Sequence, residues 1–555
     1  MEPLSLHRNR TPPRHFPSRA SALYCKGMSA EQVERNISIM GAPLAGRAGL
    51  FTRVFNRIFS RHLLYATLFV LIIGFLRGNL AAVNSQLADP DIWWHLADAR
   101  IVTTTQHFIH TEPYSFSVAG ERWVNPEWLS EMPYWMGYSS LGLKGIILVS
   151  LLGLWANVFF VYWRSYRMSR HPAAAFWVAI LGFVMMTINA GPRTIVIAYL
   201  AMSAEMAILE AVGRGRTRLL WLLPPLFCVW INLHGSWLIG FALLVLYILC
   251  GLFSFEKGSF EQQAFCRADR NRLLQVLAAS LAALMVNPYG WRLIWNPFDM
   301  MFYQTLNIKS VQEWQPLSLA WAAGWAVFAA IGLLVLANCL CGRKWKIFEF
   351  ALLFFAWFAA FDHMRFTFMA AVLAVPLLTV DVARSFFSEP DEKTIPAMNA
   401  LFMIGALCVL AYIFPTNAVL KDGLAARFPL QTIASIQPSW RTFNQDGLGG
   451  IMDFNHRSPF VDSRWDIFEH HGQLQDFLNV SSFKEPLKTL DKNRIDHVLI
   501  LANWPLATLL DESSGWHVIR QEGAGEYTWD LYARTAPATP ASVVPSQPAC
   551  AAARH

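Results

Sequence analysis

Long apolar runs alternate with short polar segments through most of the chain. An α-helix needs about 20 mostly apolar residues to cross roughly 30 Å of hydrocarbon, and about eleven runs approach or reach that length. These runs are 62–83, 141–163, 173–190, 193–212, 218–233, 236–254, 272–288, 319–340, 346–361, 364–382 and 398–414. Three of them are short, so the number is open by one or two. The pattern predicts an all-α polytopic membrane domain over residues 62–414.

The pattern changes after residue 414, where shorter apolar runs are separated by polar turns. The predicted elements are a strand at 459–463, a helix at about 466–479, a strand at 496–502 and a final strand pair in WHVIRQ and YTWDLYAR. Gly447, Gly449 and Gly450 predict a turn. These elements are typical of a small α/β domain, which we place at residues 415–534.

The two ends of the chain have neither pattern. Residues 1–61 hold ten Lys or Arg against three acids and lack the apolar core and cleavage site of a secretory signal. We therefore expect a basic, disordered cytoplasmic tail. Residues 535–555 are rich in Pro and Ala and are also expected to be disordered.

Composition and charge fit this organisation. Hydrophobic residues make up 55% of the chain and charged residues only 15%, against about 25% charged in a typical soluble domain. The net charge of +7 comes from basic groups before the first run and after alternate later runs, whereas residues 84–140 contain seven acids and only Arg100 and Arg122. This alternation follows the positive-inside rule. It predicts a multi-pass protein of the plasma (inner) membrane, with a cytoplasmic N-terminus and with loop 84–140 and the C-terminal domain outside.

The charge therefore has a topological explanation and does not indicate a nucleic-acid partner. The chain contains neither a G-x-x-x-x-G-K nor a G-x-G-x-x-G motif, so no nucleotide-binding loop is supported.

Loop 84–140 carries the densest set of chemically useful residues. In DPDIWWHLAD, a helix that begins near Asp91 would place Asp91, His95 and Asp98 on one face. Two carboxylates and an imidazole could serve as a general base or hold a divalent metal. In the simpler interpretation, Asp91 only caps the helix, and Trp93 and Trp94 only anchor it at the bilayer interface.

A second short helix is predicted later in the same loop. Asn125 would cap it, Pro126 would occupy its first position, and Glu127 and Glu131 would share one face. A solvated interfacial helix explains the same residues equally well.

Polar residues also recur in the short connections that the topology places outside. They are Asn189 and Arg193, Asn232 and His234, Asn287 and Tyr289, and Asp362, His363 and Arg365. Ionisable groups near hydrocarbon usually face a cavity or one another, so these residues predict a shared cavity with loop 84–140. Helix capping or a structural ion pair is the alternative for any single residue.

The segment 287–318 is rich in aromatic residues and predicts a re-entrant or surface-lying amphipathic segment. Such a segment could line a path for a lipid tail. Glu313 and Trp314 close it, and an interface anchor is the simplest explanation of that pair.

The segments DPDIWWHLADARI, PYSFSVAGERWVNPEWLSE, WINLHGSWLIG, NPYGW, DHMRF and FVDSR resemble a bacterial subgroup of the GT-C-fold membrane glycosyltransferases. That class includes the protein O-mannosyltransferases and the aminoarabinose transferases that act on lipid A. The resemblance covers about residues 62–534. It implies a GT-C-like membrane domain with an extracytoplasmic C-terminal domain.

The resemblance also implies an activity, the transfer of a sugar from a polyprenyl-phosphate donor to a glycan, lipid or protein acceptor outside the cytoplasm. The implied roles are catalysis for Asp91, Asp89 and His95, donor-phosphate binding for Arg193, Arg365 and His234, and substrate binding for Glu127, Glu131, Asn287, Tyr289, Asp362 and His363. In the family the acids are commonly adjacent Asp-Glu, whereas Pro90 separates the two aspartates here. Which aspartate is the base, and whether Mg²⁺ or Mn²⁺ takes part, stay open.

Two other functions need a similar cavity. A transporter or flippase for a lipid-linked saccharide is one, although such proteins commonly contain internal repeats and we find none. A non-catalytic assembly factor for an envelope polysaccharide is the other.

Overall fold

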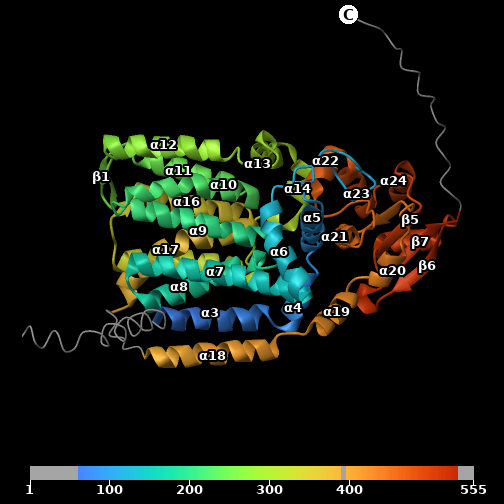
Figure 1. Ribbon diagram of the computed structural model, residues 1–555, viewed down its shortest axis with the longest axis horizontal. Coiled ribbons are helices and arrows are strands. Elements are labelled where there is room, and N and C mark those ends of the chain that lie inside the picture. The colour runs from blue at the N-terminus through green and yellow to red at the C-terminus, as the bar shows by residue number, and fades with distance from the viewer. Residues whose placement is uncertain (1–60, 389–394, 536–555) are drawn as a thin grey trace, which may run out of the picture. The chain divides into compact units, whose positions relative to one another are not determined.

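The computed structural model describes residues 61–388 and 395–535, and most of them are helical (Figure 1). Long helices lie side by side, and a small sheet follows near the C-terminus. Apart from Arg61 and Thr535, the tails predicted at 1–61 and 535–555 lie outside the described residues.

A helix overlaps each of the predicted apolar runs. These helices are α3 (Arg61–Arg77), α7 (Leu143–Ser169), α8 (Pro172–Met186), α9 (Thr194–Val212), α10 (Leu223–Leu233), α11 (Trp237–Cys250), α12 (Arg267–Ala283), α15 (Ala322–Leu340), α16 (Ile347–Asp362), α17 (Thr367–Phe386) and α18 (Pro396–Ile413). Six helical segments among the described residues are long and apolar enough to cross a membrane, or seven if α3 and α4 (Leu80–Leu87), bent by 72°, form one broken span. A polytopic helical membrane domain is therefore confirmed, while the number of eleven crossings stays a prediction.

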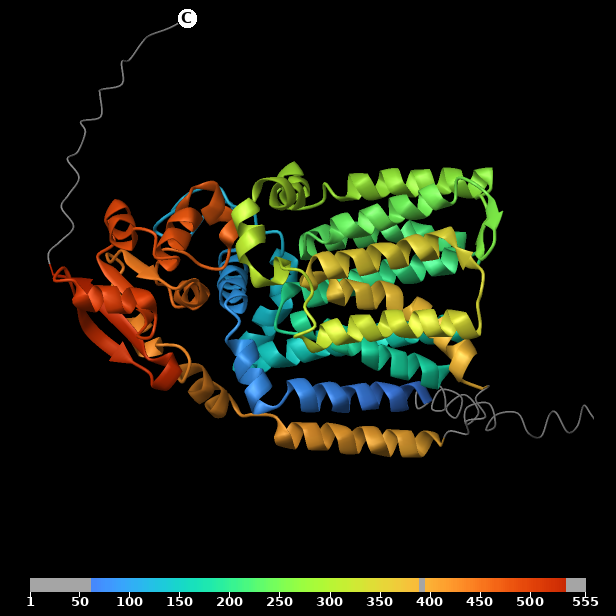
Figure 2. The same ribbon diagram turned by 180° about the vertical axis from the view of Figure 1, so that it is seen from behind.

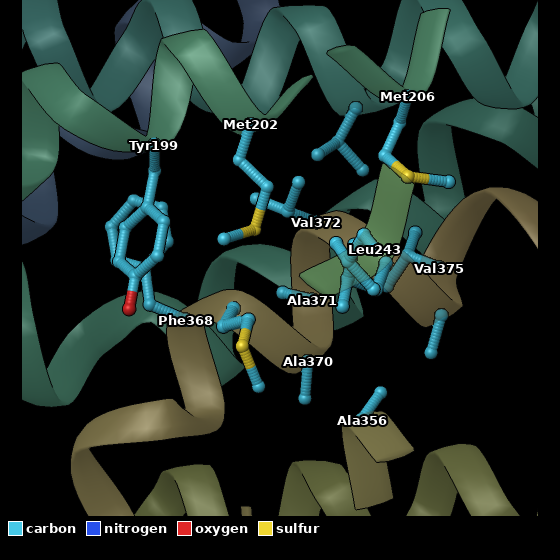
Figure 3. Close-up of a cluster of buried hydrophobic side chains, with 14 of the residues drawn as sticks. Tyr199, Met202, Met206, Leu243, Ala356, Phe368, Ala370, Ala371, Val372 and Val375 are labelled. Atoms are coloured by element: carbon cyan, nitrogen blue, oxygen red, sulfur yellow. The ribbon is translucent and has the colours of Figure 1, made fainter. Parts of the chain in front are cut away.

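Helix α17 lies at the centre of the helical domain. Within its span 89% of the residues are buried, and it packs against α7, α8, α9, α15 and α16. Figure 3 shows Tyr199 and Met202 of α9 beside Phe368 and Val372 of α17. Small residues such as Ala371 allow helices to approach closely. In lipid the hydrophobic effect does not drive helices together, so the van der Waals packing that this approach permits is a main source of helix association. Helix α18 differs, with only 11% of its span buried.

Three shorter helices lie between the long helices and the C-terminal domain in space. They are α4, α5 (Asp91–Thr105) and α6 (Trp128–Leu141), and both views place them between these two regions (Figures 1 and 2). Asn79 caps α4 through its side chain. Helix α13 (Trp291–Tyr303) and the short α14 (Thr305–Ser310) form the predicted amphipathic segment.

The C-terminal domain contains a four-stranded sheet in the order β4-β5-β7-β6. Its strands are β4 (Thr442–Asn444), β5 (His497–Leu501), β6 (Trp516–Glu522) and β7 (Trp529–Arg534), flanked by α19 (Asn417–Ala425), α20 (Leu430–Ser435), α21 (Asp446–Phe454), α22 (Trp465–His470), α23 (Gln473–Ser481), α24 (Pro486–Lys492) and α25 (Pro505–Glu512). Strand β5 and the antiparallel pair β6 and β7 confirm three predicted strands. The boundary at residue 415 stays a prediction.

Several local predictions in this domain are wrong. Residues 459–463 form only an isolated bridge at Pro459, and the helix expected at 466–479 is divided by Gly472, whose φ is +82°.

The membrane domain, which we expected to be all-α, also contains a small sheet. Its three strands are β1 (Phe255–Lys257), β2 (Phe260–Gln262) and β3 (Trp345–Lys346).

The turn predicted at Gly447, Gly449 and Gly450 is instead part of helix α21. A Cβ atom at Gly450 would lie 2.3 Å from the carbonyl oxygen of Pro90, and one at Gly449 would lie 2.3 Å from the Cα atom of Asp462. Gly450 therefore lets α21 contact the start of α5, and Gly449 lets it contact the segment at Asp462, because no side chain separates the backbones at either position.

Candidate active site

A cavity of about 200 Å³ lies where the ends of the long helices meet loop 84–140 and the C-terminal domain. Predicted site residues that line it are Asp91, His95, Glu127, Arg193, His234 and Arg365. They come from segments more than 250 residues apart in sequence. The structure thus brings together two acids of loop 84–140, Asp91 and Glu127, and polar residues from three of the four predicted connections.

The two aspartates that flank Pro90 have different surroundings. The backbone N–H of Asp91 donates to Asp89 Oδ1 at 3.1 Å, and Arg193 Nε donates to Asp89 Oδ2 at 2.8 Å. Asp89 is therefore held by an ion pair. Burial and the neighbouring charge of Asp89 raise the pKa of Asp91 to about 6, with Arg193 opposing the shift. Asp91 consequently has the proton affinity of a general base near neutral pH.

Arg193 forms ion pairs with two carboxylates, because Glu313 binds its Nη1 atom while Asp89 binds Nε. Burial lowers the pKa of Arg193, but the attraction of Asp89, Glu313 and Asp91 outweighs it and raises the pKa overall. The guanidinium thus stays charged and fixed in direction. Glu313, which we expected only to anchor the interface, lines the same cavity.

Arg365 lies in the cavity in a different way. Its guanidinium lies 4.0 Å from the ring centroid of Trp314, and Asn189 Nδ2 donates to its backbone carbonyl at 2.8 Å. Within residues 61–388 and 395–535, no carboxylate forms an ion pair with it. Its five N–H donors remain available to an anion, while the Trp314 ring favours the cation.

Two imidazoles share the carboxylate of Glu127. His234 Nε2 lies 3.1 Å from Glu127 Oε1, and His95 Nε2 lies 3.5 Å from Oε2. Because His234 Nδ1 accepts from the backbone N–H of Ser236 at 2.9 Å, Nε2 carries the proton and donates to Glu127. Burial, Arg365 and His95 lower the pKa of His234 to about 3, so this imidazole is neutral at neutral pH. Thr194 Oγ1 donates to Glu127 Oε2 at 2.5 Å.

A buried hydrogen-bonded network lies behind His95. Glu131 Oε1 lies 2.9 Å from His95 Nδ1, and Asn125 Nδ2 donates to Glu131 Oε1 and to Asp98 Oδ2, each at 2.9 Å. Tyr114 donates to Asp98 Oδ1 at 2.7 Å. Burial raises the pKa of Asp98 and of Glu131 well above the ordinary carboxyl value. Glu131 thus contacts His95 from behind and does not line the cavity.

The interpretation of Trp93 and Trp94 as bilayer anchors is wrong. Trp93 is 2% exposed and donates to the carbonyl of Leu87 at 3.0 Å. Trp94 is 7% exposed, and its ring centroid lies 3.7 Å from that of His95. Both side chains are buried because the C-terminal domain covers them, with Phe454 packed on Trp93.

The C-terminal domain closes one wall of the cavity with Ser463, Arg464, Trp465 and Asp466. Arg464 makes ion pairs with Asp462 at 2.5 Å and with Glu112 of loop 84–140 at 2.7 Å. These three side chains are at most 3% exposed, so their charges hold the domain to the loop in a dry environment. Sequence reasoning singled out this segment only through the FVDSR resemblance and gave it no site residue.

Besides Glu131, four predicted substrate-binding residues are not among those that line the cavity. Asn287 Nδ2 donates to the carbonyls of Leu284 and Gly290, and Tyr289 packs against His110. Asp362 is 56% exposed. His363 Nδ1 lies 2.6 Å from the carbonyl oxygen of Trp314, so it contacts the residue that supports Arg365.

The carboxylates around the cavity do not form a ready metal site. Among the described residues, no group of three or more His, Cys, Asp or Glu side chains is placed to hold a metal ion. Asp89 and Glu313 are paired with Arg193, and Glu127 is hydrogen-bonded to Thr194 and His234. These pairings do not fit the all-oxygen coordination that Mg²⁺ or Mn²⁺ prefers.

Comparison with known proteins identifies the fold. No family model and no curated protein matches the sequence. The oligosaccharyltransferase of Archaeoglobus fulgidus, tethered to an acceptor peptide with an NVT sequon, matches with a TM-score of 0.50 and 10% identity over 79% of this chain and 68% of that one. The same organism's AglB, in complex with an inhibitory peptide and a dolichol-phosphate, matches with a TM-score of 0.51 and 9% identity over 80% and 69%.

ArnT from Cupriavidus metallidurans, bound to undecaprenyl phosphate, matches with a TM-score of 0.45 and 14% identity over 88% of this chain and 98% of that one. The fold assignment rests on the two oligosaccharyltransferase structures. The chain shares their GT-C membrane fold, in agreement with the resemblance found in the sequence.

Proposed function

We propose that this protein is a membrane glycosyltransferase that moves a sugar from a polyprenyl-phosphate-linked donor to an acceptor outside the cytoplasm. The observation that carries the proposal is the cavity that Asp91 and Arg365 both line, a candidate base and an unpaired cation in one small space. The fold supports it, because the similar AglB structure is a complex with a dolichol-phosphate.

In this proposal Asp91 is the general base. The acceptor hydroxyl gives its proton to the Asp91 carboxylate as its oxygen attacks the anomeric carbon of the donor. The bond between that carbon and the phosphate oxygen breaks, and the polyprenyl phosphate leaves with the bonding electrons. A pKa of about 6 leaves Asp91 mostly ionised at pH 7 and still basic enough to accept the proton.

Arg365 is the proposed ligand of the donor phosphate. A guanidinium without a carboxylate partner can form charge-assisted hydrogen bonds to the phosphate and stabilise the negative charge that gathers on it as the bond breaks. Arg193 supports the site differently, by holding Asp89 in place and lowering the pKa of Asp91.

The imidazoles are proposed to orient the acceptor. His234 is neutral at neutral pH and donates to Glu127, so it contributes no positive charge to the phosphate. His95 lies between Glu127 and Glu131. This arrangement keeps both rings fixed beside Asp91, where they can position a polar acceptor group.

Helix α13 offers a path for the lipid tail of the donor. Asn296 and Met300 line the cavity, whereas Trp291 and Phe302 are more than 60% exposed. An amphipathic helix with this distribution lies at a membrane interface. A polyprenyl chain could then remain in the bilayer while its phosphate reaches Arg365.

The test uses the full-length protein in lipid nanodiscs, a panel of polyprenyl-phosphate sugars and cell-envelope acceptors. Wild type is expected to release polyprenyl phosphate and form a glycosylated acceptor. Asp91→Asn is expected to form both products much more slowly. Asp422→Asn is the matched control, because Asp422 is exposed on α19, away from the cavity.

Equal rates for wild type and Asp91→Asn would reject Asp91 as the base. Movement of intact lipid-linked saccharide across vesicles, without donor consumption, would replace the enzyme proposal with a flippase.

A further inference from the structure

A second polar region lies at the opposite end of α9. This helix of 19 residues begins at Thr194, which lines the candidate active site, and ends at Val212, about 27 Å away at 1.5 Å per residue. A groove of about 250 Å³ lies beside its last turns. The rim of this arginine groove includes Arg167, Arg214 and Arg216, and its floor includes Trp163, Ile208 and Leu219.

The rim carries positive charge without a counter-ion from the protein. Among the described residues, no carboxylate oxygen lies within ion-pair distance of the three guanidiniums. Glu210, the acid in the groove, accepts instead from Arg164 Nε at 3.0 Å and Nη2 at 2.6 Å. Like charges held close together without a partner favour an external anion.

The pKa of Arg214 reflects this crowding. Burial lowers it, Glu210 opposes the shift, and the guanidiniums of Arg167, Arg170 and Arg216 lower it further. An anion bound between these side chains would remove the repulsion.

The floor indicates what kind of anion fits. Trp163 is 36% exposed, and Ile208 and Leu219 are half-buried beside it. The floor belongs to the ends of α7 and α9, which are both long and apolar enough to span the membrane, and to the segment that follows α9. A small soluble anion would contact only the rim. An amphiphile with a phosphate and an acyl chain would contact both the rim and the floor.

We propose that the arginine groove binds an anionic phospholipid, whose phosphate contacts Arg167, Arg214 and Arg216 and whose acyl chain lies on Trp163, Ile208 and Leu219. Guanidiniums match phosphate oxygens in geometry as well as charge. Basic pockets between membrane helices bind anionic headgroups for the same reason. This site is separate from the proposed glycosyl transfer and does not depend on it.

The experiment measures lipid binding by the purified full-length protein in detergent, with fluorescent phosphatidylglycerol and phosphatidylcholine as probes. Three variants are compared with wild type. One carries Arg167→Gln, Arg214→Gln and Arg216→Gln, and the matched control carries Arg218→Gln, Arg267→Gln and Arg270→Gln, which change the net charge equally at exposed positions that do not line the groove. The third variant replaces the three rim arginines with Lys.

Wild type, the control and the Lys variant are expected to prefer phosphatidylglycerol, and the Gln rim variant is expected to bind it about 100-fold more weakly. Equal binding by the rim and control variants would overturn the proposal. The Lys variant is expected to bind less tightly than wild type but more tightly than the Gln rim variant, because Lys keeps the charge and loses the guanidinium geometry. Glycerol 3-phosphate is added as a competitor, and complete displacement of the lipid at equal concentration would assign the groove to a soluble phosphate instead.

Discussion

The two ends of helix α9 hold arginines in opposite circumstances. At its start, Arg193 is enclosed by Asp89 and Glu313 beside a cavity of about 200 Å³. Beyond its end, Arg214 and Arg216 are exposed and face no carboxylate partner among the described residues. At the first end, carboxylates of the protein neutralise the arginine. At the second end, the positive charge is left for an anion from outside the protein.

The same contrast occurs within the cavity and explains the roles that we propose there. Arg193 is paired and therefore orients its neighbours, whereas the Arg365 guanidinium lies over the ring of Trp314, has no ion pair within the described part of the chain, and can bind an anion. Pairing state, more than the presence of an arginine, separates a structural cation from a ligand-binding cation.

The largest expected effect is on kcat, which should depend on the candidate active site at the start of α9 and not on the arginines beyond its end. Asp91→Asn removes the proposed base and is expected to lower kcat by about 10²- to 10⁴-fold. Arg214→Gln, at the other end of α9, is expected to leave kcat unchanged. The measurement is the initial rate of polyprenyl phosphate release at saturating donor. Comparable losses in both variants would contradict the division between the two ends.

A smaller effect is expected for the unpaired cation of the cavity. Arg365→Gln removes charge-assisted hydrogen bonds worth about 1.5–3 kcal/mol, so kcat/KM is expected to fall by about 10- to 100-fold. Arg365→Lys keeps the charge and should recover part of the loss. A Gln variant with wild-type kcat/KM would show that the donor phosphate binds elsewhere.

The two ends of α9 are also expected to differ in how much their arginines contribute to the stability of the protein. Arg193→Gln leaves Asp89 and Glu313 without their shared partner, and we expect a loss of about 1–3 kcal/mol, between the values for exposed and fully buried ion pairs. Arg214→Gln breaks no ion pair and should change stability by less than about 0.5 kcal/mol. Thermal unfolding in the same detergent compares the two variants. An equal or larger loss for Arg214→Gln would contradict the pairing assignments.

The smallest expected effect is a shift of the pH profile. Because the carboxylate form of Asp91 accepts the proton, kcat/KM should decrease as the pH falls below about 6, where Asp91 becomes protonated. Arg193 lowers the pKa of Asp91 and Asp89 raises it, so Arg193→Gln should move the acidic limb to higher pH and Asp89→Asn to lower pH. Shifts of the same sign in both variants would reject this electrostatic account.

Sequence patterns predicted the parts of the site that depend on topology. The charge alternation placed polar connections on one side, and Arg193, His234 and Arg365 do line one cavity with Asp91. Helical spacing placed His95 near Asp91, because residues four positions apart share a face. These predictions succeeded because each rests on local periodicity or on membrane topology.

Contacts between distant segments were not predictable in the same way. Trp93 and Trp94 are amphipathic enough for an interface, and only the packing of α21 against α5 shows that they are buried. The pairing of Arg464 with Glu112 joins residues 352 positions apart, and no periodic pattern connects them. Asn287 and Asp362 are polar and lie in connections that the topology groups with the site, but neither lines the cavity.

A cryo-EM structure of the full-length protein with a polyprenyl-phosphate sugar tests the central claim most directly. The account predicts that the donor phosphate lies within hydrogen-bond distance of Arg365, at about 3 Å, with the sugar beside Asp91. A phosphate found instead in the arginine groove, with the cavity beside Asp91 lacking the sugar, would contradict it.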